Sequence, residues 1–277
     1  MKEAEPKPKP PRPPAPPHEA WFGPDGLLPA TFRWEEPALD LPTRRDASAL
    51  PHILGMDRAA RTLHSLCLSA PEGTWPDLSP TVRELHREYE SWQADQIARN
   101  GLEVRCGAGC GACCHQYPLE VHAFEILHLH GEIRARDDYP ALIEACRRRA
   151  VDYREWQEYA ALTYPAPAWD DDDRTALAQE HDFDENRPCL FLDGGRSCSV
   201  HAARPFTCRM FLSLSDPQLC TSELNTAPGT RQFTLPPEEA VTLRLERVDR
   251  CLPDWGHDGS LYGSLAALHD RLEGAVP

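Results

Sequence analysis

Eight cysteines between residues 106 and 220 are the feature that most constrains this chain. Four of them fall within residues 106–114, and four more follow around an Arg-Pro pair. Thiolates are soft ligands that select zinc, copper(I) and iron–sulfur clusters. Because four thiolates complete one zinc site or one cubane cluster, eight can complete one site with spares or two sites. The candidate metal ligands are Cys106, Cys110, Cys113, Cys114, Cys189, Cys198, Cys208 and Cys220.

The first four cysteines lie in a glycine-rich segment that suits close wrapping around a metal centre. Gly107, Gly109 and Gly111 can adopt dihedral angles closed to other residues. Such a wrap directs amide N–H groups toward the sulfurs. Adjacent Cys113 and Cys114 point in different directions in any regular backbone, so we expect them to serve different sites, or one of them not to be a ligand. The second group has to fold back to complete the coordination, which couples metal binding to folding.

The other cysteines and two nearby histidines are expected to have different roles. Cys67, Cys146 and Cys251 fall in segments with helical patterns and are expected to be buried packing residues. His115 and His201 lie beside candidate ligands and are possible ligands themselves, although surface roles are favoured.

An Arg-Pro pair before Cys208 predicts the start of a helix, because proline fits a first helical turn. We expect the helix that begins at Arg204-Pro205 to face the metal centre with its N-terminus. The partial positive charge there, together with Arg204 and Arg209, would offset thiolate charge. For Arg209, a surface salt bridge with one of the many carboxylates is an equal alternative.

Charge and lysine content exclude several classes of protein. The formal net charge is −15, which repels nucleic acid phosphates. The only lysines are Lys2, Lys7 and Lys9, so the rest of the chain offers none for a Walker-type phosphate loop or for Schiff-base chemistry. Use of arginine for nearly all positive charge is typical of a GC-rich genome, and we expect a bacterial source.

The sequence favours a chain that neither spans a membrane nor is exported by a signal peptide. No run of about 18 apolar residues is present, which predicts that the chain does not span a membrane. The N-terminus has no apolar stretch followed by a small-residue cleavage site. We therefore expect a cytoplasmic protein whose cysteines remain thiols or bind metal.

Hydrophobic periodicity predicts a mainly α fold, in which helices surround an irregular cysteine-rich centre and strands are few and short. We expect a disordered proline-rich tail (1–17), which could instead dock to a partner, an extended strap (18–57), and one helical domain (58–277) with its cysteine core at about 100–220. Ser79 is the expected cap of the clearest helix, and the acidic run Asp170–Asp173 is expected to be a solvated loop. The predicted helices span 58–68, 79–101, 118–130, 140–164, 237–251 and 260–273.

The spacing of the cysteines resembles the YkgJ-like cysteine-cluster family, whose members are described as zinc- or iron-chelating domains. Relatives often have tyrosine where this chain has His201, a departure that leaves the ligand set intact. The resemblance covers about residues 100–220 and implies metal binding without narrowing the activity. The residues that carry it are Cys106, Cys110, Cys113, Cys114, Cys189, Cys198, Arg204, Pro205, Cys208 and Arg209.

These observations favour a metal-binding protein that acts in electron transfer, metal handling or the maturation of another protein, with a protein or redox partner. Iron–sulfur is favoured over zinc, because the paired CxxC knuckles typical of structural zinc are missing. Two alternatives are a cluster-dependent enzyme that modifies proteins or peptides and a structural zinc module for partner binding. Cys106, Cys110 and Cys113 have the spacing of radical S-adenosylmethionine enzymes, but a helix precedes the loop and alternating strands are absent. Thiol–disulfide exchange is less favoured, because the lone CxxC lacks a strand–helix setting.

Overall fold

The computed structural model describes residues 49–71, 74–107, 109–163, 171–222 and 231–273. This part of the chain is mainly helical, as predicted, and its only sheet is one short antiparallel pair of strands. The predicted proline-rich tail and most of the predicted strap lie outside the described residues. The helices are α1 (Leu50–Ser69), α2 (Ser79–Arg99), α3 (Ala123–Ile133), α4 (Tyr139–Thr163), α5 (Asp171–Asp184), α6 (Phe206–Met210), α7 (Glu239–Cys251) and α8 (Leu261–Glu273), with 3-10 turns at Cys113–His115, His201–Ala203 and Pro217–Cys220, and the strands are β1 (Phe211–Ser213) and β2 (Gln232–Thr234).

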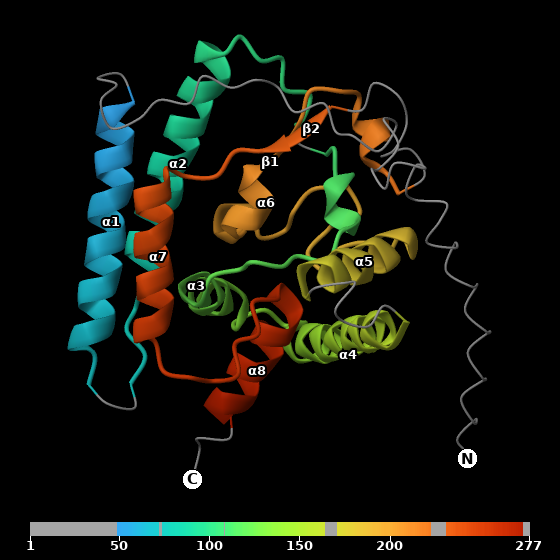
Figure 1. The fold of residues 1–277 in the computed structure, drawn as a ribbon. Helices are drawn as coiled ribbons and strands as arrows, with labels where there is room; N and C mark the ends of the chain where they lie inside the picture. Colours follow the sequence, from blue (N-terminus) through green and yellow to red (C-terminus); the bar gives the residue numbers. More distant parts are fainter. Residues whose placement is uncertain (1–48, 72–73, 108, 164–170, 223–230, 274–277) are drawn as a thin grey trace.

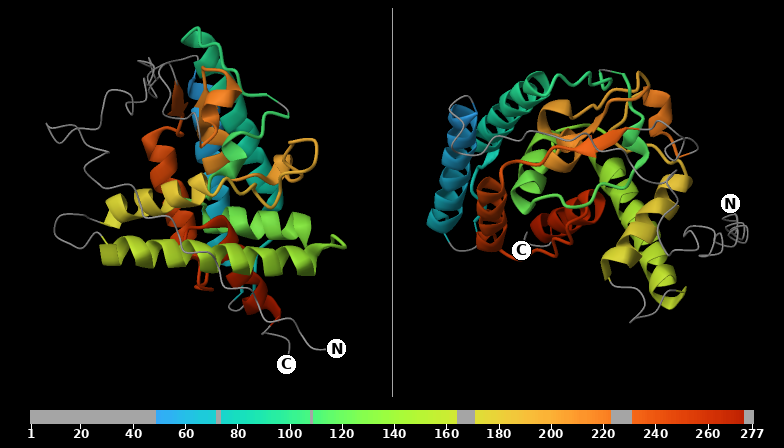
Figure 2. Two further views of the ribbon diagram at one scale, coloured as in Figure 1. Left: turned by 90° about the vertical axis from the view of Figure 1, so that its right-hand side faces the viewer. Right: turned by 45° about the horizontal axis from the view of Figure 1, so that its top comes forward.

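Two groups of helices enclose a central one (Figure 1). Helix α1 packs on α2 and α7, and α4 packs on α5 and α8. Helix α3 contacts α2, α7 and α8 and so joins the two groups. The axes of α4 and α5 run across those of α1 and α2 (Figure 2). Helix α6 and the β1–β2 pair lie between the two groups, on one side of α3.

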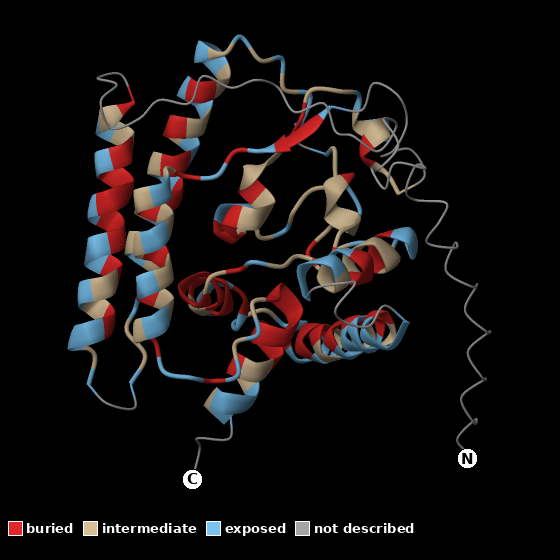
Figure 3. Cartoon of the chain, viewed as in Figure 1, coloured by how far each residue is buried: buried red, intermediate tan, exposed pale blue. Residues whose placement is uncertain are grey.

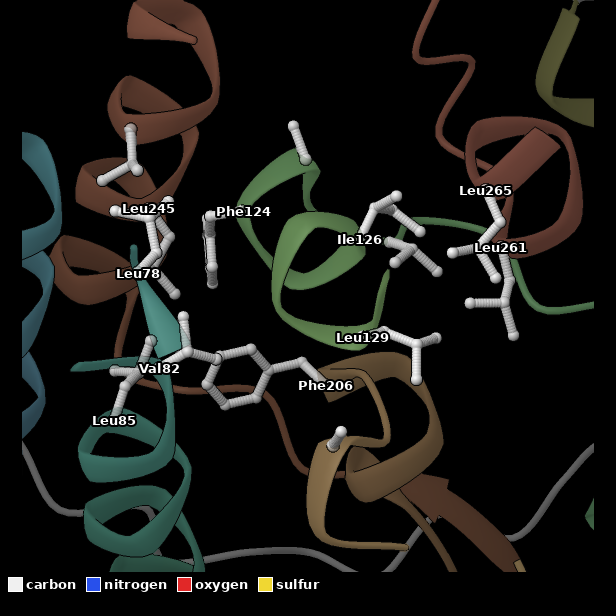
Figure 4. Close-up of a cluster of buried hydrophobic side chains, with 14 of the residues drawn as sticks. Leu78, Val82, Leu85, Phe124, Ile126, Leu129, Phe206, Leu245, Leu261 and Leu265 are labelled. Carbon is white, nitrogen blue, oxygen red and sulfur yellow. The ribbon is translucent and has the colours of Figure 1, made fainter. Parts of the chain in front are cut away.

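The hydrophobic core follows α3, which is buried on nearly every side (Figure 3). Phe206 of α6 points toward Val82 and Leu85 of α2, and Ile126 of α3 faces Leu261 of α8 (Figure 4). Burying one such side chain contributes about 1.5–3 kcal/mol. The short helix α6, which carries Cys208, is therefore held by its apolar contacts with α2 and α3.

Several boundaries differ from the sequence predictions. Helix α1 begins at Leu50 instead of Arg58, so residues 50–57, expected to be extended, are helical. Ser79 is the first residue of α2 and not its cap, and its hydroxyl lies 3.0 Å from Nδ1 of His128. The acidic run was expected to be a loop, but residues 171–173 form the exposed first turn of α5. Carboxylates are favourable there because a helix N-terminus carries partial positive charge.

None of the helices in the described part of the chain is both long and apolar enough to cross a membrane.

Candidate metal centre

Five of the eight candidate ligands line one cavity of about 300 Å³. They come from three separate segments: the turn that follows the glycine-rich loop, the hairpin-like segment 189–198 and helix α6. Tertiary folding therefore brings both cysteine groups together, as the sequence predicted. We call these five residues the inner thiol group; they are Cys113, Cys114, Cys189, Cys198 and Cys208.

The remaining three candidates, Cys106, Cys110 and Cys220, form an outer thiol group. Partial desolvation of its sulfur, and then the neighbouring Cys110 and Cys220 thiols, raise the pKa of Cys106. Ser213 of β1 links two members, since its N–H donates to Sγ of Cys106 at 3.2 Å and its side chain is hydrogen-bonded to Cys220. Cys220 is buried and Cys106 is exposed, so this group reaches from the interior to the surface.

Cys113 and Cys114 are hydrogen-bonded to each other through their side chains. This contact, together with burial, raises the pKa of Cys113, and the same contact lowers the pKa of Cys114. Cys114 interacts with Cys189, Cys198 and Cys208, whereas Cys113 also interacts with Cys106 of the outer group. Cys113 thus lies where the two groups meet. Assignment of the adjacent pair to different metal sites stays a prediction.

The second cysteine segment is anchored on the first by backbone contacts. The N–H of Cys189 donates to the carbonyl of Cys114 at 2.6 Å, and the Arg196 guanidinium donates to the carbonyl of Cys110 at 2.9 Å. A β-bridge between Leu192 and Cys198 closes the hairpin-like turn. This segment therefore folds directly over the glycine-rich loop.

Glycine conformations in that loop agree with the sequence prediction at two of three positions. Gly109 and Gly111 have φ values of 80° and 57°, in the region that favours glycine, whereas Gly107 does not. A Cβ on Gly111 would lie 3.0 Å from the carbonyl oxygen of Arg196. Gly111 is therefore needed both for the turn and for the close approach of the second segment.

Hydrogen-bond donors surround Cys189. The N–H of Phe191 donates to its Sγ at 3.5 Å, and the Tyr262 side chain of α8 is hydrogen-bonded to it. The Tyr262 oxygen accepts the N–H of Leu190 at 3.3 Å, so its own proton is free to be donated to sulfur. Nothing in the sequence indicated Tyr262, because it lies far along the chain from the cysteine groups.

Arg204 lines the inner cavity, and its Nε is buried with no hydrogen-bond partner among the described residues. Its positive charge lowers the pKa values of several thiols, although burial, followed by the Cys189 and Cys114 thiols, keeps the pKa of Cys208 raised. A buried donor without a partner is costly, and a negatively charged occupant of this cavity would satisfy it. Arg204 therefore acts as predicted, as a counter-charge to the thiols.

Two predictions about α6 hold in part. The helix begins after Pro205 as expected and its N-terminal residues line the cysteine cavity, but its first N–H, from Phe206, donates to the buried carboxylate of Glu125 and not to sulfur. Burial raises the pKa of Cys198 and the charge of Arg209 opposes this rise, but Arg209 does not line the cavity and is not a surface group. It is buried, and its guanidinium pairs with Glu90 and donates to the carbonyls of Ala202 and Arg204. Arg209 thus fixes the turn that precedes α6.

The remaining predicted residues lie outside the inner cavity. Cys67 and Cys146 are buried in helices, as predicted, while Cys251 is half-buried against the core. Nδ1 of His115 lies 3.1 Å from the carbonyl oxygen of Asn186, and His201 is exposed. Neither histidine lines the cavity that the five cysteines share.

The thiols are gathered but not yet arranged as a coordination sphere. Across the described residues, no three side chains of Cys, His, Asp or Glu are positioned to hold a metal ion, and none of the eleven cysteines forms a disulfide. The donor set nevertheless fits a thiophilic metal: sulfur ligands line one cavity with N–H and hydroxyl donors, and the buried Nε of Arg204 has no hydrogen-bond partner among the described residues.

The fold and the cavity define a helical protein with a cysteine-lined centre. Residues 105–225 match the family CxxCxxCC, described as a "putative zinc- or iron-chelating domain". The match to these residues confirms the resemblance to YkgJ-like proteins that the cysteine spacing indicated. No curated protein and no solved structure matches the chain. Helices α1, α2, α7 and α8 lie outside the matched segment.

Proposed function

We propose that this protein binds a metal centre through its inner thiol group and handles metal through its outer thiol group. The observation that carries the proposal is the single cavity of about 300 Å³ lined by Cys113, Cys114, Cys189, Cys198 and Cys208. These five thiols exceed the four that one zinc ion or one cubane cluster requires. The family description supports chelation of zinc or iron without choosing between them.

We infer an iron–sulfur cluster in preference to zinc. A lone ion needs little more space than one water molecule, about 30 Å³, whereas the cavity is many times larger. The buried Nε of Arg204 supports a centre with net negative charge, which four thiolates give to a zinc site and to a cubane cluster alike, so the preference for a cluster rests on the size of the cavity. When bound, such a cluster would supply one-electron redox chemistry.

The outer thiol group supports a role in metal handling over one limited to electron transfer. Cys106 is exposed while Cys113 interacts with thiols of both groups, which supports a route for metal from the surface to the cavity. Exchange of metal between such thiols and a protein partner is the role we propose. A reducing compartment such as the cytoplasm would keep these thiols available.

Anaerobic purification, followed by iron, zinc and acid-labile sulfide analysis and a visible spectrum of one sample, tests the proposal. Iron with sulfide and visible absorption is the expected result. Stoichiometric zinc without colour would instead favour a structural zinc module, and absence of tightly bound metal would overturn the proposal. Cys208→Ser is expected to lose metal, whereas Cys146→Ser, which removes a buried thiol from α4, should retain it.

The proposed role of the outer group has its own test. We expect Cys106→Ser to slow the loading of metal-free protein while leaving the final metal content unchanged. Cys251→Ser, which removes a half-buried thiol far along the chain, is the matched control and should load at the wild-type rate. Unaltered loading by Cys106→Ser would reject a role in metal entry without affecting the inner site.

A further inference from the structure

A second cavity of about 390 Å³ lies beside α6 and contains none of the eight candidate ligands. It is bounded by the segment before α3, by α6, by two prolines after β2 and by α7. Phe206 and Met210 of α6 line it, whereas Thr207 and Cys208 line the cysteine cavity. The two cavities therefore lie against different faces of one short helix.

A fixed histidine–aspartate pair forms part of the second cavity. Nδ1 of His122 lies 2.6 Å from a carboxylate oxygen of Asp249, and the other oxygen of Asp249 accepts the N–H of Phe124 at 3.4 Å. The imidazole also stacks on Phe124, with ring centroids 5.0 Å apart. The backbone N–H of His122 donates to Glu125, which prevents the segment from moving away. These contacts hold the pair in a single arrangement.

The wall of this cavity is negatively charged. Burial alone would lower the pKa of His122, but the hydrogen bond to Asp249 and the nearby carboxylates raise it. A protonated His122 is therefore one positive charge against the three lining carboxylates of Glu120, Glu246 and Asp249, and Arg250 pairs with one oxygen of Glu246 at 3.2 Å, which leaves a net negative charge. Among the described residues that line the cavity there is no lysine or arginine.

The rest of the wall offers apolar surface and few free donors. The hydroxyl of Thr242 already donates to the carbonyl of Pro237 at 3.4 Å. Binding cavities of 300–1,000 Å³ are mostly apolar with a few polar groups that orient the ligand, and this cavity has that character. Its apolar lining consists of Val121, Phe206, Met210, Pro236, Pro237 and Leu245.

We propose that this cavity binds a small aliphatic ammonium ion. The ammonium group donates hydrogen bonds to the carboxylate of Glu120 and to the oxygen of Glu246 that does not accept from Arg250, and the alkyl chain contacts Met210 and Leu245. A free amine and a lysine side chain of another protein share this chemistry. The inference does not depend on the metal centre, because none of the cysteines proposed as ligands takes part.

The methionines provide a local probe, since the chain has only Met1, Met56 and Met210. Met210 lines the cavity, whereas Met56 is fully buried in α1. With ¹³C-methyl methionine in the full-length protein, we expect n-butylammonium chloride to shift the Met210 signal saturably and to leave Met56 unchanged. Equal concentrations of n-butanol or sodium butyrate should leave both signals in place. Met210→Leu assigns the signal.

Charge variants test whether the carboxylates bind the ammonium group. Glu246→Gln should weaken n-butylammonium binding at least tenfold, and Glu120→Gln provides a second variant. Glu239→Gln, also on α7 but outside the cavity, should bind as the wild type does. An unmoved Met210 signal, equal binding of butyrate, or full affinity in both cavity variants would overturn the proposal. Comparison with Nα-acetyl-lysine methylamide distinguishes a protein side chain from a free amine, according to which binds more tightly.

Discussion

Glu125 of α3 accepts the backbone N–H of Phe206, the first residue of α6, at 2.8 Å. The same carboxylate oxygen lies 3.0 Å from Nε2 of His86 on α2. Glu125 is fully buried, and its carboxylate links α3 to α2 and to the short helix α6, which carries Cys208. The position of this cysteine therefore depends on a residue that is not a candidate ligand.

Glu125→Gln should lower the free energy of unfolding by about 1.5–3 kcal/mol, the range for hydrogen bonds to charged groups. The glutamine keeps one acceptor but loses the charge that faces His86. Chemical denaturation at neutral pH measures the effect. Glu132 lies on α3, as Glu125 does, and forms an exposed ion pair with Arg83 of α2. Glu132→Gln removes this pair and should lower the free energy of unfolding by less than about 1 kcal/mol. Equal effects of the two substitutions would contradict the role given to Glu125.

Stability should fall as the pH decreases from about 6.5 to about 4, in part because of His128. Burial, followed by the charges of His86 and Arg83, lowers the pKa of His128 to about 4, although Glu125 opposes this. Below about pH 6.5 the unfolded chain therefore binds a proton at His128 that the folded chain does not bind. The stability that is present above about pH 6.5 consequently decreases as the pH falls toward about 4. One such group contributes at most about 1.4 kcal/mol per pH unit.

His128→Gln should reduce this pH dependence without abolishing it. Burial also lowers the pKa of His130 to about 4, so part of the slope remains in the variant. Denaturation curves at several pH values between 7 and 4 give the two slopes. Identical slopes for the wild type and the variant would show that His128 is protonated as readily in the folded state as in the unfolded chain.

Tyr262→Phe should alter the metal centre without removing it, provided that Cys189 is a ligand. The substitution deletes the hydroxyl that is hydrogen-bonded to Cys189 and that accepts the N–H of Leu190. Loss of such a supporting hydrogen bond lowers metal affinity by about 10- to 100-fold. Competition with a chelator measures affinity, and the visible spectrum or that of a cobalt-substituted protein reports the ligand field.

Tyr139→Phe is the matched control for this prediction. It removes a hydroxyl that lies 3.0 Å from Nδ1 of His269, in a tyrosine that does not line the cysteine cavity. Metal affinity and spectrum should remain those of the wild type. If Tyr262→Phe still binds metal with an unchanged spectrum and affinity, Tyr262 does not support the metal centre. This result would not contradict the metal centre itself.

Gly111→Ala and Gly107→Ala should differ strongly although both lie in the same loop. Alanine at 111 would be strained at a φ of 57° and would press against the carbonyl of Arg196, whereas nothing lies within 4 Å of a Cβ at 107. The left-handed conformation alone costs a non-glycine residue about 1–2 kcal/mol. We expect Gly111→Ala to lower both thermal stability and metal content. Similar behaviour of the two variants would mean that the second segment does not need this close approach.

The sequence by itself determined the class of fold and the set of candidate ligands. Periodic apolar residues predicted six of the helices, because an amphipathic helix has to bury one face and leaves that spacing in its sequence. The cysteines and the Arg-Pro pair were equally visible, because ligand chemistry depends on residue type. The start of α1 at Leu50 and the whole of α5 (Asp171–Asp184) were missed, because prolines and acidic runs are also compatible with loops.

Only the tertiary structure decided how the eight cysteines divide into two groups and what surrounds them. Cys114 and Cys208 line one cavity because α6 is fixed on α2 and α3 by Glu125 and Phe206, which local sequence does not encode. The hydroxyl of Tyr262 reaches Cys189 because α8 packs on α3 and α4. Such contacts join residues far apart in the chain, and their geometry results from packing of the whole core and not from any one segment.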